Sequence, residues 1–509
     1  MARKTAASAA EPTSKRVMQG PPWSCSLSGR RILTEVRETV KPARDAGQRW
    51  RIGLGALGLA CLLGGAEMVE ARAVPTRGEL RLLVVLAGFP DRSLAEPRRH
   101  FAGGPEALVD RLVAYYGDVS AGRLRIVPTI GGPVVTLPMP RARYVQHPDA
   151  LAEDALLAFA HAAVDPADRA ALREANGLVV FFAGTGRESH TMRGEPDDPW
   201  SNYTPLPSLR PVPEAAVFED ACVIAEDEVP PLTSFGVLCH EFGHLLGLPE
   251  LYAPGDHPQE GVGVWDLMGQ GTWLGHGEHP PHLSAWSKLQ LGWVEVETIE
   301  RTTVGVTLPA IETVPLALRV PAVPGHLQEY YLLENRERLG ADASLPGEGL
   351  LVWHVDERVT GFRTAETDVA HKRLHLVEAD GRRDLDRGHA AGGNRGDAGD
   401  PWHGPRAWRR RARAGLAFAG ALLVAAAVLR AARDRPLRAL GLLAGGGAFV
   451  VAALALGRAP VCGIGTPGMA PYDGSPIRVT IRNISPPGSS MRFDVLVAQF
   501  DSAREGVTR

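Results

Sequence analysis

The sequence is poor in cysteine and has no marked excess of charge of either sign. Five cysteines among 509 residues are too few and too scattered for a disulfide framework or an all-cysteine zinc site. Lysine and arginine number 55 and aspartate and glutamate 58, so the formal net charge is −3. Proteins that bind nucleic acid through its phosphates usually carry a dominant positive patch. The composition therefore argues against nucleic acid as a partner.

A chain of this length can form two or three domains with hydrophobic cores of their own, so its stability does not require disulfide bonds. Cys25 and Cys61 lie in an N-terminal segment that we expect to be removed or embedded in a membrane. Of the other three, which include Cys462, Cys222 and Cys239 form the only plausible pair in the body of the chain. They form either a disulfide or two small buried apolar side chains, and the second interpretation is favoured.

The first 73 residues have the pattern of an export signal that follows a polar lead. Residues 1–50 are polar, and we expect them to be disordered. Residues 51–73 hold an apolar run that is too short for a comfortable membrane span, and they end in Ala-Arg-Ala at Ala73. We predict a signal peptide cleaved after Ala73, with an uncleaved anchor or a lipoprotein site at Cys61 as alternatives. Each option places the protein outside the cytoplasm, either secreted or membrane-anchored.

Residues 78–298 have the pattern of an α/β domain. The runs 79–89 and 176–186 are rich in leucine, valine and phenylalanine, which is typical of strands buried on both faces of a sheet. Between them, residues 105–117 are amphipathic with helical spacing, and residues 154–172 also have a helical pattern. The alternation of strand and helix predicts a sheet covered by helices.

The pattern of apolar and turn-forming residues changes near residue 300. Short strand-like runs separated by glycine and proline occupy residues 299–403 and 466–501 and predict a β-rich C-terminal part. Residues 405–460 interrupt it with two apolar runs flanked by arginines. We interpret this insertion as a transmembrane helical hairpin, which implies membrane association, or alternatively as a buried soluble hairpin or a defect in the coding sequence.

The segment LCHEFGHLLGLPELY, residues 238–252, carries the clearest chemical signal. Apolar residues recur at helical spacing through it, with Thr233 or Ser234 as candidate N-cap and Gly247 as the stop. His240 and His244 are four residues apart, so on a helix they project from one face and can bind one zinc ion.

Glu241 would lie beside a metal-bound water without being a ligand itself, which suits a general base in peptide hydrolysis. Gly247 would let the chain turn back, so that Glu250 reaches the metal as third ligand. Glu260 and Asp266 are the alternatives for that position. The competing structural interpretation makes both histidines ordinary helix residues and Glu250 a surface charge.

Downstream, the segment GVGVWDLMGQGTW places Met268 among glycines. Met268 is either a core side chain or the methionine of a turn beneath zinc-binding histidines. Its position after a HExxHxxGxxE motif favours the second interpretation.

These motifs resemble the immune inhibitor A family of secreted bacterial metalloproteases, peptidase family M6. The matching segments include HEFGHLLGLPELY, GVWDLMGQGTW, HLSAWSKLQLGW and YYGDVSAGRLRI, and the resemblance extends over residues 80–403 and 466–499. It implies a zincin-type catalytic domain with an α+β or α/β mixed sheet, zinc bound by His240 and His244, Glu241 as general base and Met268 in the methionine turn. Two departures are Glu250, where the family has aspartate, and Gln270, where some metzincins have a tyrosine.

A second metal is suggested by GNRGDAGDPW, where Asn394, Asp397 and Asp400 offer hard oxygen ligands suited to calcium. A polar turn without a metal is the alternative. Together these features predict an exported zinc metalloendopeptidase that acts on protein or peptide substrates. The competing hypothesis is a non-catalytic, membrane-attached zinc-binding protein with a protease-like fold.

Overall fold

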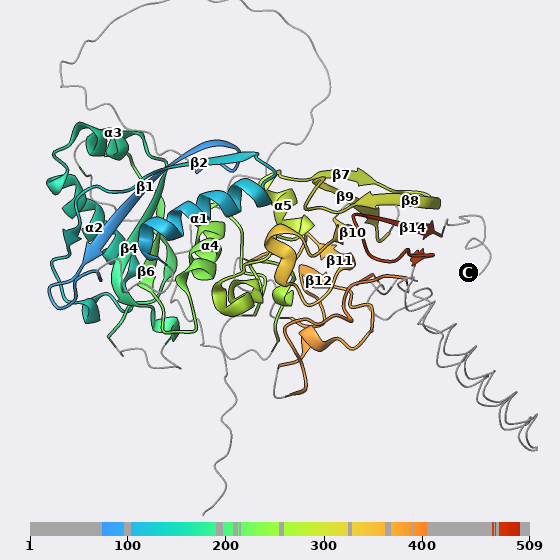
Figure 1. Ribbon diagram of the computed structural model, residues 1–509. Coiled ribbons are helices and arrows are strands. Elements are labelled where there is room, and N and C mark those ends of the chain that lie inside the picture. Colours follow the sequence, from blue (N-terminus) through green and yellow to red (C-terminus); the bar gives the residue numbers. More distant parts are fainter. Residues whose placement is uncertain are drawn as a thin grey trace, which may run out of the picture.

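The computed structural model describes most of the chain between residues 74 and 498 (Figure 1). The described residues are 74–95, 103–189, 197–206, 212, 215–253, 259–323, 328–361, 368–388, 391–404, 471–472, 474 and 478–498. The expected lead, signal segment and apolar hairpin at 1–50, 51–73 and 405–460 lie outside them. In the part that is described, no helix has the length and apolar character to cross a membrane.

A six-stranded, mostly parallel sheet organises the N-terminal half. Its strands follow the order β2-β1-β4-β6-β5, with β3 pairing beside β1, and only β5 runs antiparallel to its neighbour. The bounds are β1 (Gly78–Gly88), β2 (Leu124–Thr129), β3 (Val135–Thr136), β4 (Gly177–Thr185), β5 (Asn202–Pro205) and β6 (Asp220–Asp227). Because β5 pairs only with β6 within the described sheet, it forms one edge.

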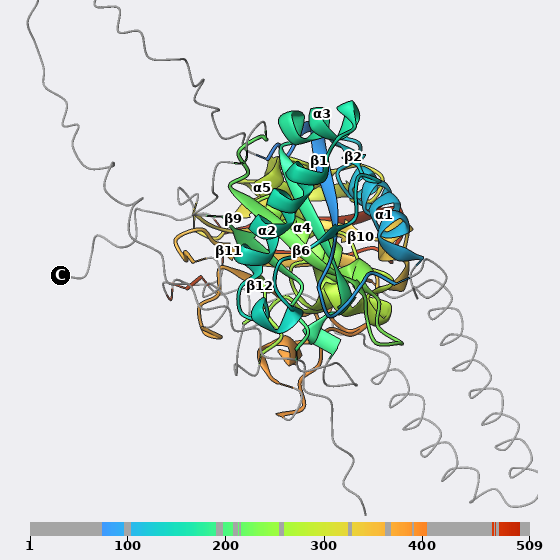
Figure 2. The ribbon, with the colours of Figure 1, turned by 90° about the vertical axis from the view of Figure 1, so that its left-hand side faces the viewer.

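Helices cover both faces of this sheet, as the continuously apolar strands require. Alternate residues of β1 point to opposite sides, so that Leu82 and Val84 join one core while Leu83 and Val85 join another. The helices α1 (Gly104–Val119) and α4 (Ser234–Leu245) pack in the first core; α2 (Pro148–Ala162) and α3 (Pro166–Glu174) pack in the second (Figure 2). The predicted mixed α/β architecture is confirmed, whereas the zincin assignment stays a prediction.

The expected helical stretch 154–172 is two helices. α2 ends at Ala162 and α3 begins at Pro166, whose ring cannot continue a helix but suits its first turn. The side chain of Asp165 caps α3 by accepting a hydrogen bond from the backbone N–H of Ala167 at 2.7 Å. The prediction that these residues are helical is confirmed, but Asp165 and Pro166 start a new helix within the segment.

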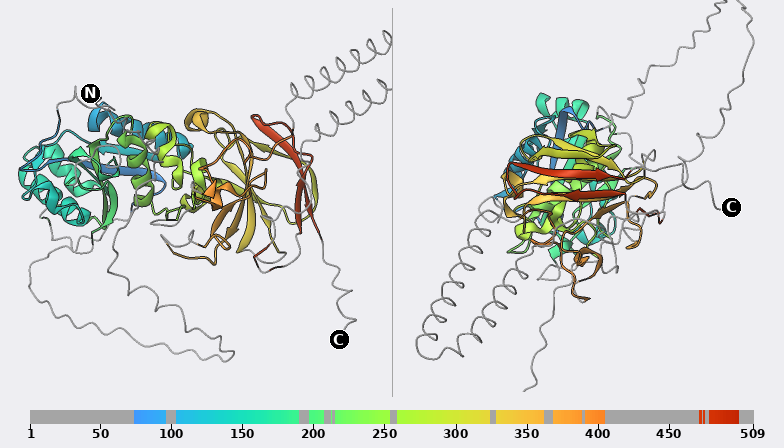
Figure 3. Two further views of the ribbon diagram at one scale, coloured as in Figure 1. Left: turned by 90° about the horizontal axis from the view of Figure 1, so that it is seen from below. Right: turned by 90° about the vertical axis from the view of Figure 1, so that its right-hand side faces the viewer.

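The C-terminal half is β-rich, as predicted. One sheet has the order β12-β11-β10-β9-β7 and a second the order β13-β14-β8 (Figure 3). The bounds are β7 (Glu295–Thr298), β8 (Thr303–Pro309), β9 (Leu316–Pro321), β10 (Glu329–Arg336), β11 (Gly349–Asp356), β12 (Leu374–Leu376), β13 (Val479–Arg482) and β14 (Ser490–Val497). β14 pairs with β8, so the last segment of the chain returns to the same β-rich part.

The two halves share one hydrophobic core. Trp353 and Leu351 of β11 belong to the same cluster as Leu238 of α4 and Trp293, which follows the short helix α5 (Ala285–Leu291). Short 3-10 turns lie between α4 and α5 and build the floor of the region described next.

Candidate active site

Helix α4 carries the motif and is buried along its whole length. All of its residues from Ser234 to Leu245 are buried, because α1, β6 and the loop 263–277 surround it. Thr233 occupies the N-cap position but its side chain makes no capping bond. The predicted stop is confirmed: Gly247 has φ +96°, a left-handed conformation that glycine adopts without strain.

The turn after Gly247 brings Glu250 back over the helix. Backbone bonds from Gly247 N–H to the His244 carbonyl and from Leu248 N–H to the Gly243 carbonyl fix this turn. As a result one oxygen of Glu250 lies 3.3 Å from Nε2 of His240 and the other 3.4 Å from Nε2 of His244. Ligand atoms of the three residues all lie within 4.8 Å of one another.

Backbone carbonyls orient both imidazole rings. Nδ1 of His240 lies 3.0 Å from the Leu267 carbonyl and Nδ1 of His244 lies 2.8 Å from the Leu248 carbonyl. Since a carbonyl can only accept, each Nδ1 carries the hydrogen, and in the neutral rings each Nε2 presents a lone pair toward Glu250. The Thr272 hydroxyl donates to the Leu267 carbonyl and lies 2.8 Å from Nδ1 of His240, so it accepts from that ring.

This donor set fits a divalent metal. Two nitrogen lone pairs and a carboxylate converge on one point, and Oε2 of Glu250 is buried without a hydrogen-bond partner among the described residues. Without a cation, a proton must take its place: burial opposes the charged form, but the carboxylate of Glu250 outweighs burial and raises the pKa of His240 to about 9. The histidines in turn hold the pKa of Glu250 well below its usual range, against the effect of burial.

Glu241 lies on the adjacent face of α4 and takes no part in that cluster of ligand atoms. Its Oε2 accepts a hydrogen bond of 2.6 Å from the backbone N–H of Tyr203 on the edge strand β5. Burial raises the pKa of the Glu241 carboxyl, while the neighbouring histidines and the Tyr203 N–H act in the opposite direction. The carboxylate is thus held at the sheet edge beside the two histidines.

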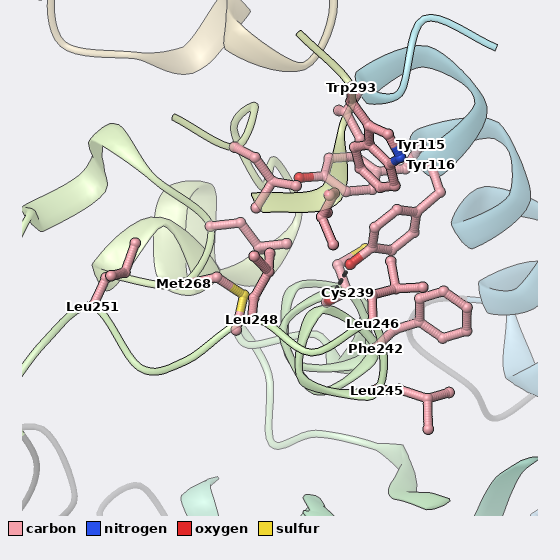
Figure 4. Close-up of a cluster of buried hydrophobic side chains, with 14 of the residues drawn as sticks. Tyr115, Tyr116, Cys239, Phe242, Leu245, Leu246, Leu248, Leu251, Met268 and Trp293 are labelled. Atoms are coloured by element: carbon pink, nitrogen blue, oxygen red, sulfur yellow. Dashed lines mark hydrogen bonds between the residues drawn. The ribbon is translucent and has the colours of Figure 1, made fainter. Parts of the chain in front are cut away.

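Met268 packs against α4 at Gly243, and its role in a methionine turn stays a prediction. It is fully buried, and a Cβ added at Gly243 of α4 would come within 2.5 Å of its sulfur. Figure 4 shows Met268 beside Leu248, at the end of the turn that follows α4. Glycine at position 243 therefore permits the close approach of the methionine loop to the helix.

The two alternative third ligands lie elsewhere. Asp266 accepts from Met268 N–H with one oxygen, and with the other from Ser284 N–H and the Ser287 hydroxyl, so it holds the methionine loop on α5. Glu260 lies 3.5 Å from the guanidinium of Arg395. Neither belongs to the group formed by the histidines and Glu250.

The sequence did not predict the supporting roles of three residues. These are Thr272, Tyr203, and Asp266 as the residue that holds the methionine loop. Thr272 and Asp266 are short polar residues in a glycine-rich segment, and Tyr203 acts through its backbone. None of them belongs to a spaced motif, so only the folded chain reveals their partners. Cys222 and Cys239 are buried free thiols, in agreement with the apolar interpretation.

The residues considered for calcium separate into two overlapping groups. Asp400 joins Glu378 and Asp380, whereas Asp397 joins Asp380 and Asp384. Asn394 uses its amide to donate to Asp384 and Asp397 and to accept from Gly396 N–H, so it braces the loop from within.

Residues 214–294 match the model of the immune inhibitor A peptidase M6 catalytic domain. Over these residues the chain is similar to the M6 family. The matched residues include α4, the turn to Glu250, and the methionine loop with Asp266 and Met268. No curated protein matches the chain. The M6 match supports the predicted family and a metallopeptidase, and the wider resemblance over 80–403 and 466–499 stays a prediction.

Proposed function

We propose that this protein is an exported zinc metalloendopeptidase. The observation that carries the proposal is the convergence of His240, His244 and Glu250, with both Nε2 atoms turned toward the carboxylate by backbone acceptors. Two imidazole nitrogens and one carboxylate form a donor set typical of catalytic zinc sites that leave a position open. When bound there, zinc would polarise the scissile carbonyl and acidify a water molecule.

Glu241 is the group that moves the proton. Its buried carboxylate would accept a proton from the attacking water and deliver it to the departing amine. The Tyr203 N–H restrains one oxygen of Glu241, which leaves the other oxygen as the basic atom. The tyrosine that some metzincins use near the oxyanion is replaced by Gln270, so the chain offers no phenol at that position.

Orientation of the histidines depends on the rest of the site. The Leu267 and Leu248 carbonyls fix the tautomer of each ring, and Thr272 adds a second acceptor at His240. Met268 closes the apolar floor beneath them. Such pre-organisation lowers the cost of assembling the site during catalysis.

Metal removal tests this proposal. The purified full chain should contain about one zinc per molecule and cleave denatured protein substrates. A chelator should abolish cleavage and lower the thermal unfolding midpoint, because a ligand that binds only the folded state stabilises it. Added zinc should restore both. Bound zinc without turnover on a broad peptide library would contradict the peptidase proposal and favour a non-catalytic zinc protein.

Export is a separate part of the proposal and rests on the N-terminal pattern. Cleavage after Ala73 would leave Val74 as the first residue, immediately before the first strand begins at Gly78. Mass spectrometry of the exported protein would detect that N-terminus. A mature chain that begins at Met1 in the cytoplasmic fraction would contradict export.

A further inference from the structure

A cluster of carboxylates lies outside the histidine site, in the segment 377–404 that follows β12. Glu378, Asp380 and Asp400 each place an oxygen within 4.8 Å of the others. Oxygen ligands about 2.4 Å from a calcium ion can be at most about 4.8 Å apart, which is twice that distance. The spacing of this group therefore suits a single shared calcium ion.

One oxygen in the cluster is buried without a partner. Asp400 is 1% exposed; its Oδ2 accepts from Trp265 Nε1–H and from Asp397 N–H, but its Oδ1 has no hydrogen-bond partner among the described residues. A buried, unpartnered carboxylate oxygen costs free energy unless a cation or a donor satisfies it. Asp400, which carries this unpaired oxygen, is one of the three carboxylates described above.

Nearby cations do not neutralise the cluster. Five carboxylates gather here, from Glu378, Asp380, Asp384, Asp397 and Asp400. Among the described residues two arginines pair with them, Arg382 with Asp380 and Asp397 and Arg387 with Asp384, and neither arginine pairs with Glu378 or Asp400. The side chain of Arg382 is 64% exposed, which weakens its effect through solvent screening.

The backbone of the loop is shaped around these carboxylates. A Cβ at Gly399 would come within 2.5 Å of Oδ2 of Asp380, so glycine allows that carboxylate to lie against the chain. Both oxygens of Glu378 accept backbone N–H bonds, from Asp384 at 2.7 Å and from Leu385 at 3.1 Å. The two buried members thus have fixed positions before any ion binds.

We propose that Glu378, Asp380 and Asp400 bind one calcium ion that fixes this loop against the segment carrying the methionine turn. The all-oxygen donor set excludes a preference for zinc, and flexible carboxylates of this spacing suit calcium better than the compact octahedron of magnesium. Asp384 and Asp397 do not belong to this group of three and bond with Arg387, Asn394 and Gly399, so they support the site from outside.

The contact with the catalytic half explains what the ion would do. Asp400 binds the indole of Trp265 at 2.9 Å, Val264 N–H donates to the Arg395 carbonyl, and Glu260 N–H donates to the Leu385 carbonyl. These bonds join the acidic loop to residues 260–265, which directly precede Asp266 and Met268. A calcium ion would therefore stiffen the approach to the methionine turn without touching the histidine site.

Calcium titration of the zinc-saturated full chain tests the proposal. At calcium about 100-fold above its Kd the unfolding midpoint should rise by roughly 3–6 °C. Terbium, which replaces calcium, should give luminescence when tryptophan is excited, because Trp265 contacts a ligand of the ion. Zinc content, measured before and after, should stay unchanged.

Variants locate the effect. Asp380→Asn, at a partly exposed position, should weaken calcium binding at least about 10-fold. Asp400→Asn should do the same, and Asp368→Asn, an exposed carboxylate outside the cluster, should leave the calcium response intact. Three results would each overturn the proposal. The unfolding midpoint of the wild-type chain would not change with calcium, magnesium would raise it as much as calcium does, or Asp380→Asn would respond to calcium as strongly as wild type.

Discussion

Glu250 is the candidate ligand whose position depends most on the path of the chain beyond α4. The spacing of His240 and His244 follows from helical geometry alone, whereas Glu250 reaches them only because Gly247 reverses the chain. The extra methylene of glutamate, where the family has aspartate, is accommodated: both oxygens lie within 3.4 Å of a histidine nitrogen.

Replacing Glu250 tests its role as third ligand. Glu250→Ala should lower zinc affinity by about 100-fold or more, since it removes a ligand rather than a supporting contact. Competition with a chromophoric chelator would measure the change. Glu260→Ala is the matched control and should bind zinc as tightly as wild type, because Glu260 lies with Arg395 and Leu385. If Glu260→Ala lost zinc and Glu250→Ala kept it, Glu260 would be the third ligand in place of Glu250.

The sequence predicts the site residues that belong to a spaced motif, but it does not predict those that contact the site from distant parts of the chain. His240, Glu241, His244 and Glu250 lie within eleven residues, so local helix and turn geometry predicts their meeting. Thr272 approaches His240 across thirty-two residues, and the Tyr203 N–H approaches Glu241 across thirty-eight. Such contacts depend on loop and sheet placement that one sequence does not encode locally.

At the scale of elements, the site rests on the packing of α4 against the methionine loop. Gly243 lies on the helix face that meets Met268, and Asp266 holds the loop from the other side. The helix itself was predictable from its apolar spacing. The loop's contact with it was suggested only by resemblance to metzincin-type proteases.

Alanine at position 243 should destabilise the protein although alanine favours helices. The propensity gain is about 0.5–1 kcal/mol, but overpacking against the buried Met268 sulfur costs about 1–3 kcal/mol, so the cost wins. Urea unfolding would show a lower midpoint. Gly117→Ala in α1 is the control: a Cβ there meets no atom within 4 Å, so its midpoint should stay level or rise. A rise in Gly243→Ala as well would refute the close packing.

At the scale of the whole molecule, the two halves are joined through buried charge as well as through apolar contact. Arg336 of β10 pairs with both oxygens of Asp342 at 2.7 Å and donates to the carbonyls of Trp265 and His282. It is fully buried, and removing one partner of such a group is strongly destabilising. The methionine loop therefore depends on the β-rich half for part of its support.

Composition and pattern anticipated this division of the chain into an α/β half and a β-rich half, because strand and helix periodicities are local. The shared core of Leu238, Trp293 and Trp353 was not foreseeable, since Leu238 and Trp353 are more than a hundred residues apart in the sequence. β7 (Glu295–Thr298) pairs with β9, so the β-rich sheet begins within the expected catalytic range 78–298. That boundary stays a prediction, as do the segments 51–73 and 405–460.

We propose that Glu241 moves the proton in a zinc-dependent cleavage of peptide bonds, and a comparison of wild type with Glu241→Gln tests this role. Glu241→Gln has nearly the same shape and leaves His240, His244 and Glu250 in place. It should retain about one zinc per chain, while the rate of peptide cleavage falls by about 10²–10⁴-fold. A zinc-loaded Glu241→Gln protein that cleaves peptides as fast as wild type would contradict the account.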